Sequence, residues 1–535
     1  MERIRPSIII SESLIDDMRT EKYHVDTWTL DLLRQTAQYF HDHQQQAYLV
    51  GGSVRNLLLN EPCTDWDIVT DGTASQSARQ LANTLGGHYA HLHNKASRVV
   101  VKHDQQAMIL DISPLKGDSI TADLHGRDFT VNAIAAPLNG VIEHLTSNSP
   151  LPLIDPLHGE TDLSARLLKA VGESIFRDDP LRMLRAVRFM MRYQLSIDPL
   201  TAQLLSRDAP LIVQAAPERI HEELYAILQP DGATDRLRFL DQHGLFMALF
   251  PEFLPARGML QPGLHYWDVL EHSLETVGTL EQLANVFQQA PELLWESALD
   301  LGKRGDLAEI QALLQEAEQQ GIFTFATLAV PPMKLAALLH DIGKTVTHSV
   351  DSEGKIHFYR HPQEGVPLAQ HMMKRLSAST EERRLVQQVV AHHMRPGQLS
   401  HDVITIRATR RFFVDLGTTG INVLLVALAD HLAMRGPAPL TEAWMHHLAT
   451  TRILLLRYIR QRDSILPPRL IQPEELIRRL HLERGPIIGT LLEQIAEAQA
   501  DGLISSKDEA LWFAEEKLGT TAIQSEKAQE RDSLS

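Results

Sequence analysis

The sequence has 535 residues, too many for a single compact core, so we expect three or more domains. A net charge of −17 excludes a protein that coats nucleic acid non-specifically, because such binding needs a broad field of lysine and arginine. Hydrophobic residues make up 44% of the chain and charged residues 22%, which excludes a largely disordered protein and predicts folded domains.

Two further features narrow the class of protein. The single cysteine, Cys63, excludes an internal disulfide framework and a cysteine-rich zinc site, and it fits a reducing compartment. The N-terminal residues carry acidic side chains and only the short apolar run Ile8–Ile10, unlike a signal peptide, and no later stretch is long enough to span a membrane. We therefore expect a soluble cytoplasmic protein in which any metal binds histidine, aspartate or glutamate.

The first folded domain is expected to be small and to combine helix with sheet. Apolar spacing predicts a helix from about Asp26 to Phe40, and short apolar runs then predict strands at AYLVGG, WDIVT, SRVVVKH and AMILDIS. After about Leu163 the β-branched runs fade and helical spacing takes over. We predict an α+β protein, in which a head with a mixed β-sheet is followed by an all-α neck, a helical body and a helical tail.

Proline and glycine mark the boundaries of the helical part. They cluster near Pro251–Pro262, and the break ILPPRLIQP precedes a final helical region. A polar, glutamine-rich stretch before KLAALLHDIGK indicates an insertion with no assigned chemistry. The predicted segments are an N-terminal extension (1–25), the head (26–163), the neck (164–250), the body (251–445) with its insertion (about 280–330), the tail (446–520) and a frayed terminus (521–535).

Two aspartates in DWDIVT form the first candidate site. Side chains alternate on an extended strand, so Asp65 and Asp67 should point to the same face with Cα atoms about 6.6 Å apart. Two carboxylates this close repel unless a cation neutralises them, and their hard oxygen atoms suit Mg²⁺. Asp111, on a later strand of the same domain, could complete a site for two ions.

A glycine turn stands just before these aspartates, in VGGSVRNLLL. Gly51 and Gly52 would let backbone N–H groups approach a phosphate closely, and Arg55, soon after Ser53, adds a forked cationic donor at the start of a helix. Taken singly, a GGS turn is more often a surface turn, and an aspartate pair is more often solvated. Together they favour a nucleotide held for in-line transfer.

Three motifs in this region carry a family resemblance. LVGGSVRNLLL, DWDIVT and GRDFTVNAIA have the order and spacing of the head domain of the class II tRNA nucleotidyltransferase and bacterial poly(A) polymerase family, and the resemblance covers most of the chain. It implies a nucleotidyltransferase that uses Mg²⁺, ATP and CTP to build or repair the 3′ end of tRNA. It also implies that Asp65 and Asp67 bind the metal and that Asp111 assists. The implied triphosphate contacts are Gly52, Ser53, Arg55 and Arg127.

The stretch DDPLRMLRAVRFMMRY spaces its arginines by three and four residues, so a helix would display them as one stripe. A positive stripe suits a triphosphate, although an ordinary solvated face has the same pattern. DDPLR is similar to the family's EDxxR element, with Asp178 in place of glutamate, and Asp179 and Arg182 would imitate a Watson–Crick partner that accepts cytosine or adenine and rejects uracil. The apolar side would hold Met183, Val187 and Met190, and the further arginines are Arg185 and Arg188, implied nucleotide contacts, and Arg192.

One departure from the family concerns the nucleotide that is added. Between LDISPLKG and DLHGRDFT this chain has only Asp118–Ala122, where the family usually carries a longer flexible loop. A shortened loop resembles that of enzymes that add two cytidines without the final adenosine. Addition of CCA, CC alone, A alone or poly(A) therefore stays open.

A second set of motifs lies in the body. LLHDIGK sets a histidine beside an aspartate on an apolar helix that ends at a glycine. A lone histidine there is more often a core residue than a ligand, but the order H, HD, D resembles the HD domain of metal-dependent phosphohydrolases. The resemblance implies a divalent ion such as Mn²⁺, Ni²⁺, Fe²⁺ or Mg²⁺ and an activated water that attacks a phosphoester. The implied ligands are His272, His340, Asp341 and Asp430, with a second ion on His361 and either His392 or His393.

The stretch LIQPEELIRRLHLERGPIIGT is similar to the tail of the same family, whose helices hold the tRNA elbow. Gly485, Pro486 and Gly489 would permit a close approach of backbone to phosphate, although a helix-capping turn explains them equally. Three alternatives to a CCA- or CC-adding enzyme remain. They are a poly(A) polymerase, a metal phosphohydrolase whose head only binds nucleotide, and a non-catalytic RNA-binding protein.

Overall fold

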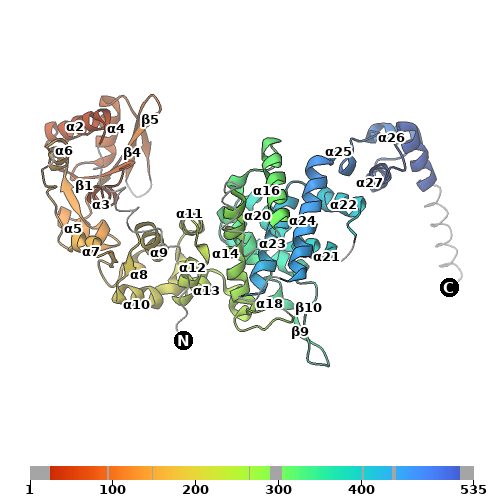
Figure 1. Ribbon diagram of the computed structural model, residues 1–535. Coiled ribbons are helices and arrows are strands. Elements are labelled where there is room, and N and C mark those ends of the chain that lie inside the picture. The colour runs from red at the N-terminus through yellow and green to blue at the C-terminus, as the bar shows by residue number, and fades with distance from the viewer. Residues whose placement is uncertain are drawn as a thin grey trace. The chain divides into compact units, whose positions relative to one another are not determined.

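The structure is a computed structural model that describes residues 25–92, 96–147, 149–263, 265–288, 304–400, 403–436 and 441–518 (Figure 1). The predicted N-terminal extension, apart from Val25, and the predicted frayed terminus lie outside the described residues. The chain divides into two compact units. The first holds residues up to Glu223 together with His243–Ala248, and the second holds Leu224–Gln242 and the chain from Leu249 onward.

The first unit contains a six-stranded mixed sheet, which confirms the predicted fold class of the head. β2 (Asp65–Thr70) and β5 (Gln106–Pro114) are parallel, and the other neighbouring strands are antiparallel. The sequence pattern did not predict β3 and β6, because β3 (HYAH) is polar and largely exposed and β6 (AAP) has only three residues, so neither forms an apolar run like that of β1. The order is β3-β4-β5-β2-β1-β6, with β1 at Ala47–Val50, β3 at His88–His91, β4 at Ser97–His103 and β6 at Ala135–Pro137.

Helices α2 (Thr27–Asp42) and α4 (Ala74–Thr84) cover one face of this sheet (Figure 1). Trp66 and Ile68 on β2 are buried beneath them, so Asp65 and Asp67, which alternate with these residues, face the opposite way. Burying a side chain such as Ile68 contributes roughly 1.5–3 kcal/mol. A slip of one residue in β2 would turn Asp67 into this core, so the apolar positions fix the direction in which the aspartates point.

Helices complete the first unit, and most of the segment predicted as the neck packs here. α9 (Arg182–Tyr193) buries Met183, Val187 and Met190, the side predicted to lie opposite its arginines. The other elements are α3 (Gly52–Leu58), α5 (Ile120–His125), α6 (Leu138–Ser147), α7 (Gly159–Ser164), α8 (Ile175–Asp178), α10 (Pro199–Asp208), α11 (Pro217–Leu228), which runs into the second unit, α13 (Leu245–Leu249), β7 (Leu167–Leu168) and β8 (Ser196–Ile197).

The second unit is helical, as predicted for the body and tail, and is built around α23 (Thr419–Met434). This helix is apolar on nearly all sides, is buried along most of its length, and packs on α14 (Val269–Gln288) and α20 (Thr380–His392). The other elements are α12 (Ala233–Gln242), α16 (Arg304–Gln319), α17 (Pro331–Leu339), α18 (Lys344–Thr347), α19 (His361–Arg375), α21 (Met394–Leu399), α22 (Ile406–Leu416), α24 (Glu442–Arg460), α25 (Arg462–Ile465), α26 (Pro473–Leu480), α27 (Pro486–Ala500) and the hairpin of β9 (His348–Val350) and β10 (Ile356–Phe358).

The predicted insertion is integrated into this unit where it is described. α16 packs along α24, and Arg452 on α24 pairs with Asp306 at 3.2 Å and with Glu309 at 2.9 Å. Among the described residues, no single helix combines the length and apolar content that a membrane crossing needs. Only α22 and α23 reach that level together, and they are bent by 106° at their junction.

Candidate active site and metal centre

The three aspartates named from the sequence meet on the face of the sheet that lies opposite α2 and α4. Asp67 stands directly opposite Asp111 in the parallel pair of β2 and β5, and Asp65 is two residues before Asp67, so all three side chains point the same way. The side chain of Asp65 is 44% exposed and that of Asp111 is 18% exposed, so both border the solvent.

The charges in this carboxylate cluster (Asp65, Asp67 and Asp111) favour a cation. Burial and the neighbouring charges of Asp111 and Asp65 raise the pKa of Asp67 to about 6, although Arg127 and Arg55 oppose this. A cation beside Asp67 relieves the repulsion that this carboxylate experiences from the other two. Because the donor atoms are all carboxylate oxygens, the cluster fits a hard divalent ion such as Mg²⁺.

The glycine turn lies against the cluster. Gly51 has φ of +63°, a conformation that favours glycine, and a Cβ there would stand 2.8 Å from Nη1 of Arg127 and displace that guanidinium. The Ser53 hydroxyl donates to the Asp65 carbonyl at 3.0 Å and accepts from the Asp67 N–H at 2.8 Å. The serine side chain therefore ties the turn to β2.

The two arginines beside this turn differ in their surroundings. Arg55 is buried, its guanidinium lies 4.1 Å from the ring centroid of Tyr193, and it donates to the Tyr193 hydroxyl at 2.5 Å and to the Asn132 side chain. Arg127 is 23% exposed and pairs with Asp123 at 2.9 Å. Arg127 is the freer of the two to meet a ligand, whereas packing fixes Arg55.

The arginines of α9 form the predicted stripe, and those named as nucleotide contacts have partners within the unit. Arg182 donates to the Gly126 carbonyl at 3.0 Å, Arg185 pairs with Asp128 at 2.7 Å, and Arg188 pairs with Glu223 at 2.6 Å. Asp179, just before α9, pairs with Arg219 at 2.9 Å. A base that bonds to Asp179 would therefore share its carboxylate with Arg219, a residue that the sequence pattern did not single out.

In the second unit the structure brings together four of the predicted metal ligands, and we call these the first ligand set. One donor atom from each lies within 4.8 Å of the others. Nε2 of His272 is 3.0 Å from Asp430 and 3.3 Å from Nε2 of His340, which in turn is 3.2 Å from Asp341. His272 is on α14, Asp430 is on α23, and His340 and Asp341 directly follow α17.

The helix predicted to carry both His340 and Asp341 ends earlier, at Leu339. Tighter turns follow, in which the N–H groups of Ile342 and Lys344 donate to the carbonyl oxygens of Leu339 and Asp341, three residues earlier. Gly343 lies in these turns, and a Cβ there would lie 1.9 Å from the carbonyl oxygen of His361. The glycine therefore allows the turn after α17 to press against the start of α19. That contact brings His361 to Asp341, with Nε2 at 3.2 Å from Oδ1.

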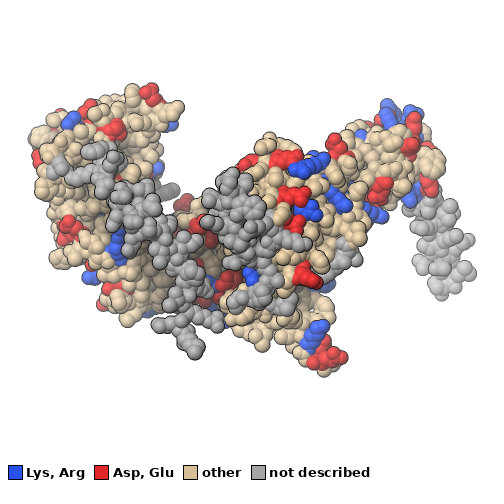
Figure 2. Space-filling model, viewed as in Figure 1, with Lys and Arg blue, Asp and Glu red and all other residues tan. Residues whose placement is uncertain are grey.

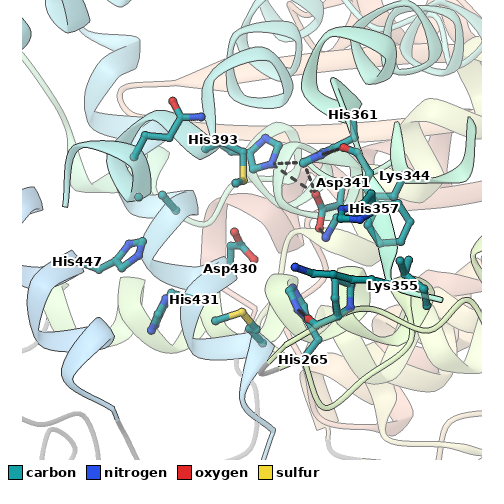
Figure 3. Close-up of a pocket in the computed structure, with 18 residues that line it drawn as sticks. His265, Asp341, Lys344, Lys355, His357, His361, His393, Asp430, His431 and His447 are labelled. Carbon is teal, nitrogen blue, oxygen red and sulfur yellow. Dashed lines mark hydrogen bonds and ion pairs between the residues drawn. The ribbon is translucent and has the colours of Figure 1, made fainter. Parts of the chain in front are cut away.

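His361, His393 and Asp341 form a second ligand set, and Asp341 thus belongs to both (Figure 3). Nε2 of His393 lies 3.4 Å from Asp341 and 3.3 Å from Nε2 of His361. Of the two neighbouring histidines left open by the sequence, His393 is 2% exposed and joins the set, whereas His392 is only partly buried and does not.

Backbone carbonyls fix the orientation of three of these rings. Nδ1 of His340, His361 and His393 lies 2.7, 2.9 and 2.9 Å from the carbonyl oxygen of the residue three positions earlier. Nδ1 therefore carries a hydrogen, and Nε2 faces the centre of the site, as in a metal ligand. Burial disfavours a charge on His340, but Asp341 and Asp430 raise its pKa to about 10. Burial is likewise outweighed at Asp341, where Lys344 and His340 hold the pKa well below its usual range.

A cavity of about 480 Å³ borders both ligand sets (Figure 3). Its charged lining includes Lys355 from the hairpin and Lys344, whose Nζ lies 2.5 Å from Asp341, and its apolar lining includes Phe358 and Met434. The sequence pattern missed both lysines. Lys344 could have been found, because it ends the HDIGK string that supplied the ligands.

Comparison with known proteins places these sites in a family context. Residues 47–169 match the family described as the poly A polymerase head domain. Residues 194–257 match one described as a probable RNA- and SrmB-binding site of polymerase A, and residues 314–435 match the HD domain.

Several relatives match nearly the whole chain. An A-adding tRNA nucleotidyltransferase of Deinococcus radiodurans is 30% identical over 88% of this chain and 95% of its own length. A CC-adding tRNA nucleotidyltransferase of Thermus thermophilus is 30% identical over 88% of this chain and 93% of its own length. A CCA-adding enzyme solved with ATP shares the fold, with a TM-score of 0.60 and 21% identity over 95% of this chain and 98% of its own.

Proposed function

Because the chain belongs to the tRNA nucleotidyltransferase family, we propose that it adds CMP, AMP or both to the 3′ end of tRNA without a template. The observation that carries this proposal is the carboxylate cluster on β2 and β5 beside the glycine turn. In the reaction, the RNA 3′ oxygen forms a bond to the α-phosphorus of the nucleotide, and the bond from that phosphorus to the departing pyrophosphate breaks.

Asp65 and Asp67 would hold the divalent ions, and Asp111 would assist. Such ions polarise the attacking hydroxyl and stabilise charge on the leaving group. Gly52 and Ser53 would meet the triphosphate through the start of α3, and Arg127 through its exposed side chain. Arg55, which donates to the Tyr193 hydroxyl, would line the buried side of this triphosphate site.

Base choice is assigned to Asp179 and Arg182. An aspartate accepts a hydrogen bond from the exocyclic amine of cytosine or adenine, and an arginine donates to a ring or carbonyl acceptor. The connection from β5 to α5 is only Leu115–Ser119, and this favours CMP over AMP as the nucleotide added. Arg185 and Arg188 would contact the nucleotide after exchange of their present partners.

One incubation tests this proposal. Purified protein is given tRNA lacking its CCA end with CTP alone, ATP alone, or both, and products are resolved at single-nucleotide length. Growth by two residues with CTP supports CC addition, a third residue with ATP supports CCA addition, and long ATP-only products on an oligo(A) primer favour a poly(A) polymerase. Asp67→Asn should lower transfer on the order of a hundredfold or more. If Asp67→Asn transfers at the wild-type rate, the proposal is wrong.

A second candidate activity, metal-dependent phosphohydrolysis, is favoured by the two ligand sets that share Asp341. Imidazole and carboxylate donors suit Mn²⁺, Ni²⁺, Fe²⁺ or Mg²⁺. Phosphate release from 2′-phosphate or 2′,3′-cyclic substrates should disappear in Asp341→Asn and survive in Asp67→Asn. CMP transfer should show the reverse pattern, which separates the two activities.

The tail is proposed to bind the tRNA elbow. Lys and Arg gather over α26 and the residues after it (Figure 2), where Arg478, Arg479 and Arg484 are exposed. Such side chains neutralise backbone phosphates, which makes binding sensitive to salt. We also propose a cytoplasmic location, supported by the tRNA substrate and by the single buried cysteine, Cys63.

A further inference from the structure

Arg98 on β4 stands within the carboxylate cluster and has no role in the transfer described above. It lies directly opposite Asp111 in the antiparallel pair of β4 and β5. Its Nε donates to Oδ1 of Asp111 at 2.8 Å, and its Nη2 donates to Oδ2 at 2.7 Å. One guanidinium therefore engages both oxygens of this carboxylate.

The same guanidinium also approaches a second member of the cluster. Nη2 of Arg98 is 3.8 Å from Oδ2 of Asp65, and the side chain is 34% exposed. Within the part of the chain that the structure describes, Nη1 has no hydrogen-bond partner. Arg98 thus places a permanent positive charge beside the carboxylates, and Nη1 of its guanidinium can donate to another group.

We propose that Arg98 competes with divalent ions for Asp111 and releases it when a triphosphate binds. This inference rests on the proposed function. A carboxylate that holds an arginine on both oxygens is a poor metal ligand, because the positive charge repels the ion. Phosphate is the other group that matches the geometry of a guanidinium, and a triphosphate brought to the glycine turn offers it. Arg98 is therefore a positioning residue that makes Asp111 available to metal only when nucleotide is present.

Metal binding measured without nucleotide tests this directly. Free Mn²⁺ is titrated by electron paramagnetic resonance in the full-length wild type, Arg98→Gln and Asp67→Asn. Asp67→Asn weakens the carboxylate cluster and leaves the ligands of the second unit unchanged. The difference between its Mn²⁺ binding and that of the wild type is therefore the binding by the first unit. We expect Arg98→Gln to bind Mn²⁺ in the first unit about three- to tenfold more tightly than the wild type. A non-hydrolysable CTP analogue, which also brings phosphate ligands to the ion, should tighten Mn²⁺ binding by a larger factor in the wild type than in Arg98→Gln.

Two further variants act as controls. Arg98→Lys keeps the charge but can bond to one oxygen at a time, so it should lie between the wild type and Arg98→Gln. The tighter Mn²⁺ binding should vanish in the double variant Arg98→Gln/Asp111→Asn, because the carboxylate that the loss of Arg98 releases is no longer there. Equal Mn²⁺ binding by the wild type and Arg98→Gln, or a gain that persists without Asp111, overturns the inference. If that happens while Asp67→Asn still lowers CMP transfer as expected, only the role proposed for Arg98 is wrong. If Asp67→Asn transfers CMP at the wild-type rate, the proposed function itself is wrong.

Discussion

Asp67 stands directly opposite Asp111 across the only parallel strand pair of the described six-stranded sheet, and with burial this pairing raises the pKa of Asp67 to about 6. Above that pH Asp67 is ionised and ready to bind a cation. Below it, a proton and a divalent ion compete for the same oxygen atoms.

We expect the Mg²⁺ concentration needed for half-maximal CMP transfer to rise by about tenfold for each pH unit below 6, because each ion must displace one proton from Asp67. The requirement should be nearly constant above pH 7. Transfer rates from pH 5 to 8, with Mg²⁺ varied at each pH, measure this. Asp111→Asn removes a charge that raises the pKa of Asp67, so in this variant the Mg²⁺ requirement should begin to rise at a lower pH. An unshifted pH profile in that variant would contradict the prediction.

Removing the carboxylate of Asp179 should weaken the choice between bases. We expect Asp179→Ala to reduce the preference for CTP over UTP by about ten- to a hundredfold in kcat/KM, because a paired acceptor and donor discriminate by roughly 1–3 kcal/mol. Incorporation of labelled CTP and UTP into tRNA lacking CCA measures the ratio. Arg192→Ala, which removes a charge from α9 at a position with no assigned nucleotide contact, should keep the wild-type preference.

The contact between Arg55 and Tyr193 should stabilise the first unit. Tyr193→Phe removes the hydroxyl that accepts from Arg55 and leaves a buried guanidinium with one partner fewer, so we expect a loss of about 1–2 kcal/mol in unfolding free energy. Tyr193→Leu also removes the stacked ring and should cost more. Urea unfolding followed by tryptophan fluorescence tests this. Tyr48→Phe, which loses a hydroxyl bonded to the exposed Gln46, is the matched control and should change little.

His392 and His393, which are neighbours at the end of α20, should differ in metal binding. We expect His393→Gln to lose one bound Mn²⁺ per chain, because Nε2 of His393 belongs to the second ligand set. His392→Gln should bind as the wild type does, since His392 lies outside both sets. Equilibrium dialysis with metal analysis counts the ions. Equal losses in both variants would argue against the second set.

The sequence predicted features that depend on local periods. The alternation of a strand was enough to place Asp65 and Asp67 on one face, and the order of elements was enough for the fold class. The choice of His393 over His392 was also within reach, because Val386, Val389 and Val390 define the buried side of α20 and His393 continues it by helical spacing.

Contacts between residues far apart in the chain were not within reach. Asp111 stands beside Asp67 because β5 inserts between β4 and β2 in the sheet, and no local pattern encodes that order. Arg219 and Asp179 are separated by 40 positions, and their pairing depends on how α11 packs near α9. Arg98 carried a weak signal, a charge among the valines of SRVVVKH, but its partner could not be read from one strand.

Asp341 gives one oxygen atom to each ligand set of the second unit. An ion on one oxygen withdraws electron density from the other and adds a positive charge a few ångströms away. Two ions would therefore load one after the other with unequal affinity, and the weaker position would empty first when metal is scarce. Metal supply, rather than the fold, would then decide whether this centre works with one ion or with two.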